Sequence, residues 1–265
     1  MDHRPKKRFG QNFLHDRSVV DRIMAAADLQ KTDQVLEIGP GLGALTDRML
    51  PLVDRLHVME LDRDLIDGLN ARQASNLCVH SGDALRMDWD EVLGAGPVKL
   101  VANLPYNISS QVLFKLLDHR QLFARAVLMF QKEVGDRICA PPGNRDYGIL
   151  SVFCQLWFDV RRVVTVPPGA FNPPPKVTSA VLAFEPLAQP RVPVTDEAFF
   201  RRVVKGAFAQ RRKTLRNTLT SAGFGFDGLE QAMADIGIDS GRRGETLSLD
   251  EFARLAAALG KHLSH

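Results

Sequence analysis

The residues best suited to chemistry are Asn103, Leu104, Pro105 and Tyr106, which follow the apolar run 98–102. The side-chain oxygen of Asn103 and the backbone carbonyl of Leu104 would accept hydrogen bonds from the two N–H groups of an adenine amine. Pro105 would hold that carbonyl in place, because proline restricts its own backbone and that of the preceding residue. Tyr106 would stack on the base, contributing roughly 1–3 kcal/mol. The amine nitrogen would then point its lone pair at a methyl donor, so catalysis would rest on positioning and need no strong base.

Taken alone, the same residues fit a strand-end turn whose asparagine caps a helix equally well. Two loops upstream favour the catalytic interpretation. "EIGPGLGALT" (residues 37–46) is a strand, a glycine-rich turn and a helix start, in which Gly39, Gly41 and Ala44 also fit a dinucleotide-binding pattern. Glu60 lies about 20 residues further on, where an acid would hold ribose hydroxyls.

Asp83 ends the next strand, where its carboxylate is available to an adenine amine. Glu60 for a ribose and Asp83 for a base together describe an adenosine-type ligand. Neither loop carries an extra group for a polyphosphate, so S-adenosylmethionine fits better than a nicotinamide cofactor.

The helices and strands that must position these residues are predicted from two patterns of apolar residues that alternate along the chain. Helical spacing of apolar residues predicts helices over residues 19–29, 44–53, 63–72 and 109–119, with Asp16 or Ser18 capping the first and Pro51 ending the second early. Apolar runs predict strands over residues 34–39, 55–61, 76–84, 98–102 and 126–131. This alternation is typical of an α/β fold with a mainly parallel sheet covered on both faces.

Two further strands, over residues 158–166 and 177–185, are joined by a proline-rich loop and are predicted to form an antiparallel pair at one sheet edge. The prolines should hold Phe171 outward at low entropic cost, so that its ring clamps an extruded base opposite Tyr106. We predict a catalytic domain over residues 1–185, a linker over 186–195 and a small all-α domain over 196–265. Ser248 and Glu251 form the capping box of its last helix.

The net charge is only +3, but basic residues gather in two places. Residues 201–216 hold seven arginines and lysines and no acid, and Arg4, Lys6, Lys7 and Arg8 open the chain. Such clusters fit either a polyanion partner or a solvated helix face.

Composition excludes several classes of protein. No apolar run approaches the length of a membrane helix, and the basic start lacks the apolar core of a secretory signal. The three cysteines lack C-x-x-C spacing, and their odd number suits a reducing, cytoplasmic compartment. The histidines form no ligand pattern with them. We therefore expect no metal, no membrane contact and, by default, a monomer.

The motifs "FGQNFL" (residues 9–14), "ELDRD", "NLPYNIS", "FNPPPKVTSAV" and "QRRKTLRNTL", with the glycine loop, resemble the bacterial small-subunit ribosomal RNA adenine dimethyltransferases over nearly the whole chain. The resemblance implies a Rossmann-like class I S-adenosylmethionine-dependent methyltransferase fold. It implies dimethylation of the N6 amines of two adjacent adenines, in a hairpin loop near the 3′ end of 16S rRNA, within the immature small subunit. It also implies cofactor contacts and RNA contacts. The cofactor contacts are Asn12, Leu14, Gly39, Glu60, Asp83 and Asn103, and the RNA contacts are Arg211, Arg212 and Lys213.

Four alternatives compete with this interpretation. A DNA adenine methyltransferase usually has proline where Leu104 stands. The antibiotic-resistance dimethylases of large-subunit rRNA resemble this chain more closely than the DNA methyltransferases do. The motifs "FGQNFL", "NLPYNIS" and "QRRKTLRN" nevertheless favour the small-subunit enzymes. A mainly non-catalytic ribosome-assembly factor and a nicotinamide dehydrogenase are the other two.

Overall fold

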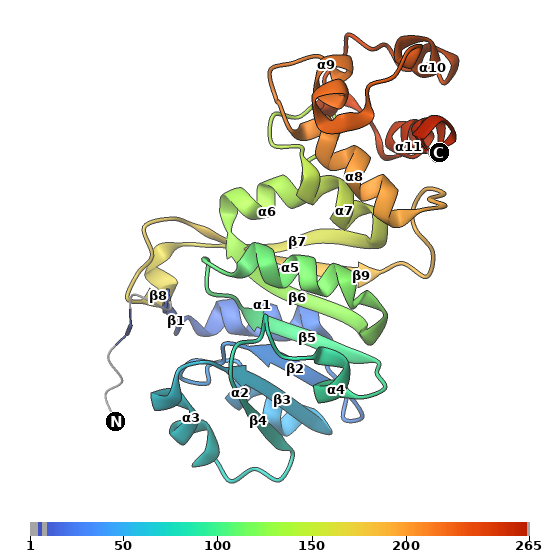
Figure 1. Ribbon diagram of the computed structural model, residues 1–265. Helices are drawn as coiled ribbons and strands as arrows, with labels where there is room; N and C mark the ends of the chain where they lie inside the picture. The colour runs from blue at the N-terminus through green and yellow to red at the C-terminus, as the bar shows by residue number, and fades with distance from the viewer. Residues whose placement is uncertain (1–4, 7–9, 264–265) are drawn as a thin grey trace. The chain divides into compact units, whose positions relative to one another are not determined.

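The computed structural model of the protein describes residues 5–6 and 10–263 (Figure 1). Four residues singled out by the sequence therefore lie outside the described residues, namely Arg4, Lys7, Arg8 and Phe9.

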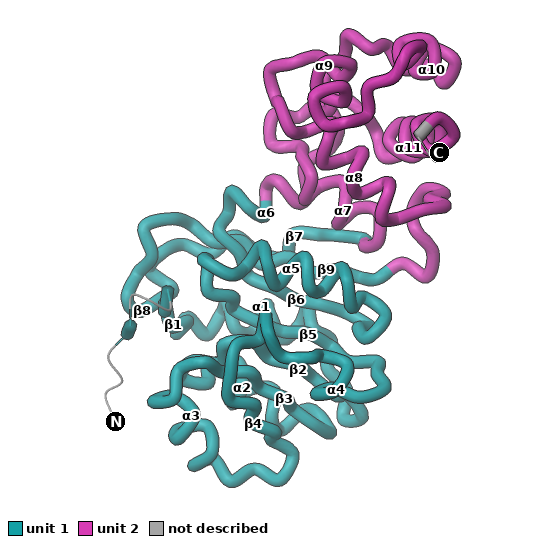
Figure 2. The backbone as a smooth tube through the Cα atoms, viewed as in Figure 1, with its two compact units in different colours: residues 1–135, 159–186 teal, residues 136–158, 187–265 magenta. Residues whose placement is uncertain are grey.

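The chain forms two compact units (Figure 2), one of residues 1–135 and 159–186 and the other of residues 136–158 and 187–265. The division differs from the predicted domain boundaries, because residues 136–158 group with the second unit. Their last turn is tied to the predicted linker by backbone hydrogen bonds, from Leu187 N to the carbonyl of Trp157 (2.9 Å) and from Arg191 N to that of Leu156 (2.8 Å). These bonds hold the linker against a helix that precedes it in the chain.

The first unit is built on a seven-stranded sheet of order β4-β3-β2-β5-β6-β9-β7. Its strands are β2 (Gln34–Ile38), β3 (Arg55–Glu60), β4 (Leu77–Ser81), β5 (Val98–Asn103), β6 (Phe123–Gln131), β7 (Phe158–Val166) and β9 (Ser179–Pro186). The pairs β4–β3, β3–β2, β2–β5 and β5–β6 are parallel, whereas β9 is antiparallel to β6 and neighbours β7 at the edge. The predicted α/β fold and the edge position of the last two strands are confirmed.

Helices and 3-10 turns connect the strands. They are α1 (Arg17–Ala27), α2 (Thr46–Met49), η2 (Leu50–Leu52), α3 (Arg63–Asn70), α4 (Trp89–Leu93), α5 (Ser109–Asp118), η3 (Arg120–Leu122), α6 (Lys132–Cys139) and η4 (Pro168–Ala170). One core of the unit joins α1 and α2 to the sheet, through buried residues such as Ile23, Met49, Val58 and Val127. Burial of this apolar area stabilises the packing of α1 and α2 on the sheet.

Local chemistry sets the helix ends. Asp16, rather than Ser18, caps α1, because its carboxylate accepts from Ser18 N (2.9 Å) and Val19 N (3.2 Å). The second helix stops at Met49 and continues only as a 3-10 turn through Pro51, as expected for a proline. At α5 the cap is Ile108, with no side-chain hydrogen bond, so neither Asn103 nor Asn107 serves as a helix cap there.

The second unit is helical. It contains α7 (Ile149–Trp157), α8 (Glu197–Phe208), α9 (Leu215–Leu219), the π-turn η5 (Thr220–Phe224), α10 (Leu229–Asp235), η6 (Gly244–Thr246) and α11 (Leu249–Leu263). The predicted capping box of α11 is confirmed: Ser248 N donates to Glu251 Oε2 (2.8 Å), and Glu251 N donates to Ser248 Oγ (3.2 Å).

Across residues 5–6 and 10–263, the helices are too short or too polar to cross a bilayer. The same residues contain no cluster of three His, Cys, Asp or Glu side chains that could hold a metal ion.

Candidate active site

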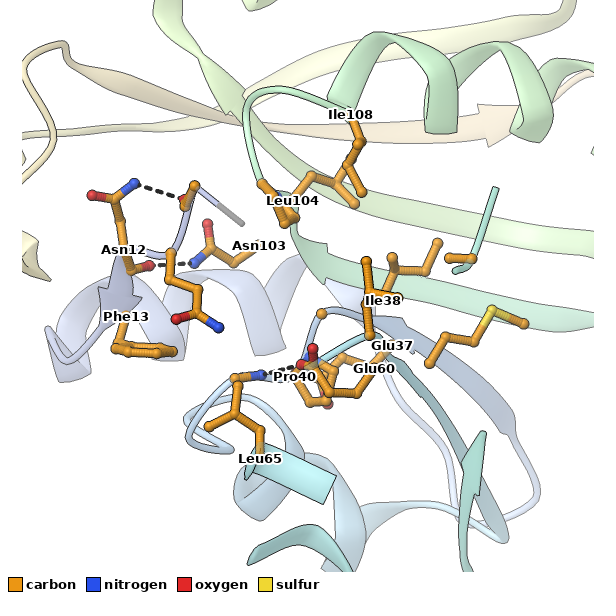
Figure 3. Close-up of a pocket in the computed structure, with 18 of the residues that line it drawn as sticks. Asn12, Phe13, Glu37, Ile38, Pro40, Glu60, Leu65, Asn103, Leu104 and Ile108 are labelled. Carbon is orange, nitrogen blue, oxygen red and sulfur yellow. Dashed lines mark hydrogen bonds between the residues drawn. The ribbon is translucent and has the colours of Figure 1, made fainter. Parts of the chain in front are cut away.

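One cavity opens at the carboxyl ends of β2, β3, β4 and β5 (Figure 3). Carboxyl ends of neighbouring parallel strands share one edge of a sheet, so the loops that follow them converge there. Eight of the predicted site residues of this unit line the cavity, namely Asn12, Leu14, Gly39, Glu60, Asp83, Asn103, Leu104 and Tyr106. The structure thus brings together residues that are far apart in the sequence.

The glycine loop after β2 needs glycine for a steric reason. Gly39 and Gly41 have φ angles of +66° and +58°, which favour a residue without Cβ. A Cβ on Gly41 would lie 2.9 Å from the ring of Phe13, closer than side-chain carbons pack. The loop and the N-terminal segment therefore approach each other closely at the mouth of the cavity.

Glu60 ends β3 with its carboxylate held by backbone donors. Its Oε1 accepts from Asp62 N (2.8 Å), and its Oε2 accepts from Gly41 N at a long 3.4 Å. Burial raises the pKa of Glu60, although these hydrogen bonds favour the ionised form. The carboxylate is fixed in direction and borders the cavity.

Glu37 lies within the cavity wall although we did not predict it as a site residue. It is buried in β2, and its Oε2 accepts from Thr46 Oγ1 (2.6 Å). Burial raises the pKa of Glu37 to about 8. The available signal was an acid within an otherwise apolar strand, immediately before the glycine loop.

The turn after β5 holds the groups predicted to bind the substrate amine. Asn103 Nδ2 donates to the backbone carbonyl of Asn12 (3.2 Å), which Figure 3 shows as a dashed line. This bond orients the amide, and its Oδ1 accepts no hydrogen bond from any residue the structure describes. The Tyr106 hydroxyl bonds Ser179 Oγ (2.6 Å), and burial raises the pKa of that hydroxyl.

The N-terminal segment is fastened to the turn after β3. Lys6 Nζ lies 2.6 Å from carboxylate oxygens of both Asp62 and Asp64, and Gln11 Nε2 donates to Asp62 Oδ2 (2.8 Å). Residue types and spacing did not predict a role for this segment, and Asn12 and Leu14 were expected in the site only from the family resemblance. Contacts between a chain terminus and a distant turn leave no periodic signal.

The expectation that the proline-rich loop holds Phe171 outward is wrong. Phe171 is 2% exposed and belongs to the hydrophobic core. It lies in the two-residue strand β8 (Phe171–Asn172), which pairs with β1 (Phe13–Leu14) so that Leu14 faces Phe171. The loop therefore folds back on the N-terminal segment, and the ring does not line the cavity.

The predicted RNA-binding residues lie in the second unit. Arg211, Arg212 and Lys213 are exposed in the turn between α8 and α9. Arg211 Nε pairs with Glu245 Oε2 (3.1 Å), whereas Arg212 has no ion pair with any described residue.

The sheet and its cavity define a class I S-adenosylmethionine-dependent methyltransferase. Solved structures share this fold. A dimethyladenosine transferase from Plasmodium falciparum is 28% identical with a TM-score of 0.80, covering 94% of this chain and 98% of its own. The 23S rRNA methyltransferase ErmE is 25% identical with a TM-score of 0.71, covering 94% and 99%.

The family model for "Ribosomal RNA adenine dimethylase" matches residues 2–261, and the chain belongs to that family. Curated relatives called "Ribosomal RNA small subunit methyltransferase A" include one from Syntrophotalea carbinolica, which is 70% identical over 99% of both chains. Another, from Geobacter metallireducens, is 54% identical over 97% of this chain and 96% of its own. The resemblance noted from the motifs is confirmed, and the protein is an enzyme whose methyl donor is S-adenosylmethionine.

Proposed function

We propose that this protein dimethylates the N6 amines of two adjacent adenines in a hairpin loop near the 3′ end of 16S rRNA, within an immature small ribosomal subunit. One observation carries the proposal: the Asn103 turn opens into the same cavity as the glycine loop and the two strand-end acids. The names of the curated relatives support the small subunit as the particle that is modified.

The cavity residues fit the methyl donor. The glycine loop packs closely against Phe13 and Pro105 at the cavity, and Glu60 and Asp83 place carboxylates at the ends of β3 and β4. We assign Glu60 to the ribose hydroxyls and Asp83 to the adenine amine of the donor, with Gly39, Asn12 and Leu14 as further contacts. When bound, S-adenosylmethionine supplies an electrophilic methyl group on a sulfonium.

We assign Asn103 Oδ1 and the Leu104 carbonyl to the substrate amine and the Tyr106 ring to the face of the base. These residues would hold the amine with its nitrogen lone pair toward the methyl group that the bound donor would supply, and the amine would release one proton to water on accepting that group. Asn103 needs no basicity, because its Oδ1 only has to accept a hydrogen bond from the amine and orient it.

Arg211, Arg212 and Lys213 are assigned to rRNA phosphates, which explains three neighbouring exposed cations in one turn. This proposal places the enzyme in the cytoplasm as a monomer. Under this proposal the chain is neither a large-subunit dimethylase nor an assembly factor in which methylation is secondary.

The decisive experiment transfers labelled methyl groups to small subunits from a strain that lacks the modification, and then maps the modified nucleotides. We expect two adjacent dimethyladenines near the 3′ end of 16S rRNA and no label in large subunits. Label only in 23S rRNA would reject the proposal. Glu60→Ala should abolish transfer while binding to immature subunits persists, which separates catalysis from assembly.

A further inference from the structure

The loop that carries Asp83 runs over residues 82–87, directly after β4. Asp83 and Ala84 line the cavity, and Gly82 N donates to the carbonyl of Glu60 (2.9 Å). The Asp83 carboxylate also accepts from Leu85 N (2.9 Å). Its position therefore depends on the backbone of this one short loop.

Lys115 of α5 holds that backbone from outside the cavity. Its Nζ donates to the carbonyls of Ala84 (3.2 Å), Leu85 (3.1 Å) and Met87. An ammonium has three donors, so the loop uses all of them. Trp89 adds to this anchor, since its Nε1 donates to the Ala84 carbonyl (3.0 Å) and its ring lies 5.1 Å from Lys115 Nζ.

Two nearby acids, Asp88 and Asp83, act electrostatically on the Lys115 ammonium. Burial lowers the pKa of Lys115, while the Asp88 and Asp83 carboxylates raise it. The ion-pair partner of Asp83 is Arg86, whose Nε lies 3.6 Å from Asp83 Oδ2, so Lys115 acts on Asp83 through the backbone of the loop. In addition, α5 begins at Ser109, three residues after Tyr106, so one helix follows the substrate turn and braces the cofactor loop.

We propose that Lys115 is a positioning residue that sets the preference of the cofactor site for the adenine amine, by holding the loop that carries Asp83. The inference rests on the assignment of Asp83 to that amine. Charge-assisted hydrogen bonds to three carbonyls fix the loop more firmly than neutral bonds would. Without them the loop that carries the Asp83 carboxylate loses its anchor on α5.

The test compares Lys115→Met with the parent protein by calorimetric titration of two ligands. One is S-adenosylhomocysteine, and the other is its analogue with hydrogen in place of the adenine amine. We expect Kd for S-adenosylhomocysteine to rise about tenfold, the loss typical of a charge-assisted contact, and Kd for the analogue to change less than about twofold. Equal losses for both ligands, or no loss, would overturn the inference, because a purely structural lysine cannot distinguish them.

Lys99→Met is the matched control. Like Lys115, Lys99 donates from Nζ to a backbone carbonyl, that of Asp28, and it also pairs with Asp33 (2.8 Å), but it lies in β5 away from the cavity lining. The Lys99→Met substitution should lower the free energy of unfolding without changing the ratio of the Kd values for S-adenosylhomocysteine and its analogue.

Asp83→Ala separates this inference from the proposed function. If Asp83→Ala removes the preference for the amine and Lys115→Met does not, the positioning role of Lys115 is wrong while the Asp83 assignment stands. If Asp83→Ala leaves the preference intact, the assignment itself is wrong. In the double variant, the loss of Lys115 should add nothing to the loss of Asp83, since the two act through one contact.

Discussion

Asn103 and Asn12 connect two segments that are 91 residues apart, through a hydrogen bond from an amide to a backbone carbonyl. The Asn103 nitrogen is occupied by this bond, and the amide oxygen is thereby directed away from Asn12. An asparagine can divide its donor and acceptor in this way, whereas an aspartate carboxylate offers acceptors alone. The residue type is therefore explained by both the fold and the proposed chemistry.

Asn103→Ala should reduce kcat by about 10²–10³-fold, the usual loss when one preorganised group at a reacting centre is removed. The Kd for S-adenosylhomocysteine should change less than about threefold, because the strand-end acids remain. Single-turnover transfer to unmethylated small subunits and calorimetric titration measure the two quantities. Asn76→Ala is the control, since Asn76 bonds the carbonyls of Leu50 and Val53 away from the cavity lining. Near-normal turnover of Asn103→Ala would remove Asn103 from the mechanism.

Glu37 predicts a pH dependence of stability in the cofactor-free protein. Its folded pKa of about 8 is above the ordinary value, so the folded state keeps a proton that the unfolded chain releases. The contribution of Glu37 to the free energy of unfolding is complete below its unfolded pKa and falls as pH rises toward 8. The loss by pH 7 amounts to about 3 kcal/mol.

Glu37→Gln should flatten this dependence and raise stability at neutral pH, because the amide cannot ionise and its oxygen still accepts from Thr46. Urea unfolding between about pH 5 and pH 8 checks the prediction. Glu91→Gln, which changes an exposed acid, should leave the slope unchanged. A Glu37→Gln slope equal to that of the parent would show that Glu37 is ionised in the folded protein.

At the scale of elements, the sequence predicted what depends on local periodicity. The ends of β2, β3 and β5 and the start of the α11 capping box were found within a residue or two, because apolar runs and cap residues set them. Since parallel strand ends converge, those boundaries were also enough to assemble Gly39, Glu60 and Asn103.

Long-range contacts set the features that were missed. Residues 136–158 join the second unit through backbone bonds to the predicted linker, and no local pattern encodes such partners. The β1–β8 pair is two residues long on each side, too short to show alternation, yet it turns Phe171 into the core. Prolines restrict the backbone of the loop itself, but they do not determine which part of the fold the loop packs against.

The start of α11 allows a prediction about one element. Arg242 bonds Glu251 at both carboxylate oxygens, and this pairing lowers the pKa of Glu251 to about 2. That stabilisation is present above the ordinary pKa of a glutamate and is lost as pH falls toward 2. Glu251→Gln keeps the capping box but removes the charge, so it should cost about 2 kcal/mol at neutral pH and almost nothing near pH 2.

Chemical unfolding followed by helical circular dichroism measures this difference. Asp250→Asn, in the exposed pair of Asp250 with Arg254, is the control and should cost under about 1 kcal/mol. A cost of Glu251→Gln that did not shrink on acidification would mean that packing, rather than the ion pair, sets the stability of α11.

At the scale of the whole molecule, charge is concentrated rather than large. A net charge of +3 cannot bring a protein to RNA by itself, but local clusters can. Within the basic run of residues 201–216, some cations form ion pairs with acids that the structure describes and others do not. Arg211 is engaged by Glu245, and Arg216 by Glu230 (2.7 Å), whereas exposed Arg212 has no such partner among the described residues.

Arg212 should therefore be able to bind an rRNA phosphate without first breaking an ion pair with a described residue. Arg212→Gln is expected to weaken binding to unmethylated small subunits and to lower the slope of log K against log salt by about one, the effect of losing one phosphate contact. Filter binding over a range of salt concentrations measures both. Lys31→Gln removes an equal charge from an exposed position of the first unit and should leave the slope unchanged. If the two variants gave the same slope as the parent, the turn between α8 and α9 would be a solvated surface, and the phosphate contacts would have to come from other residues.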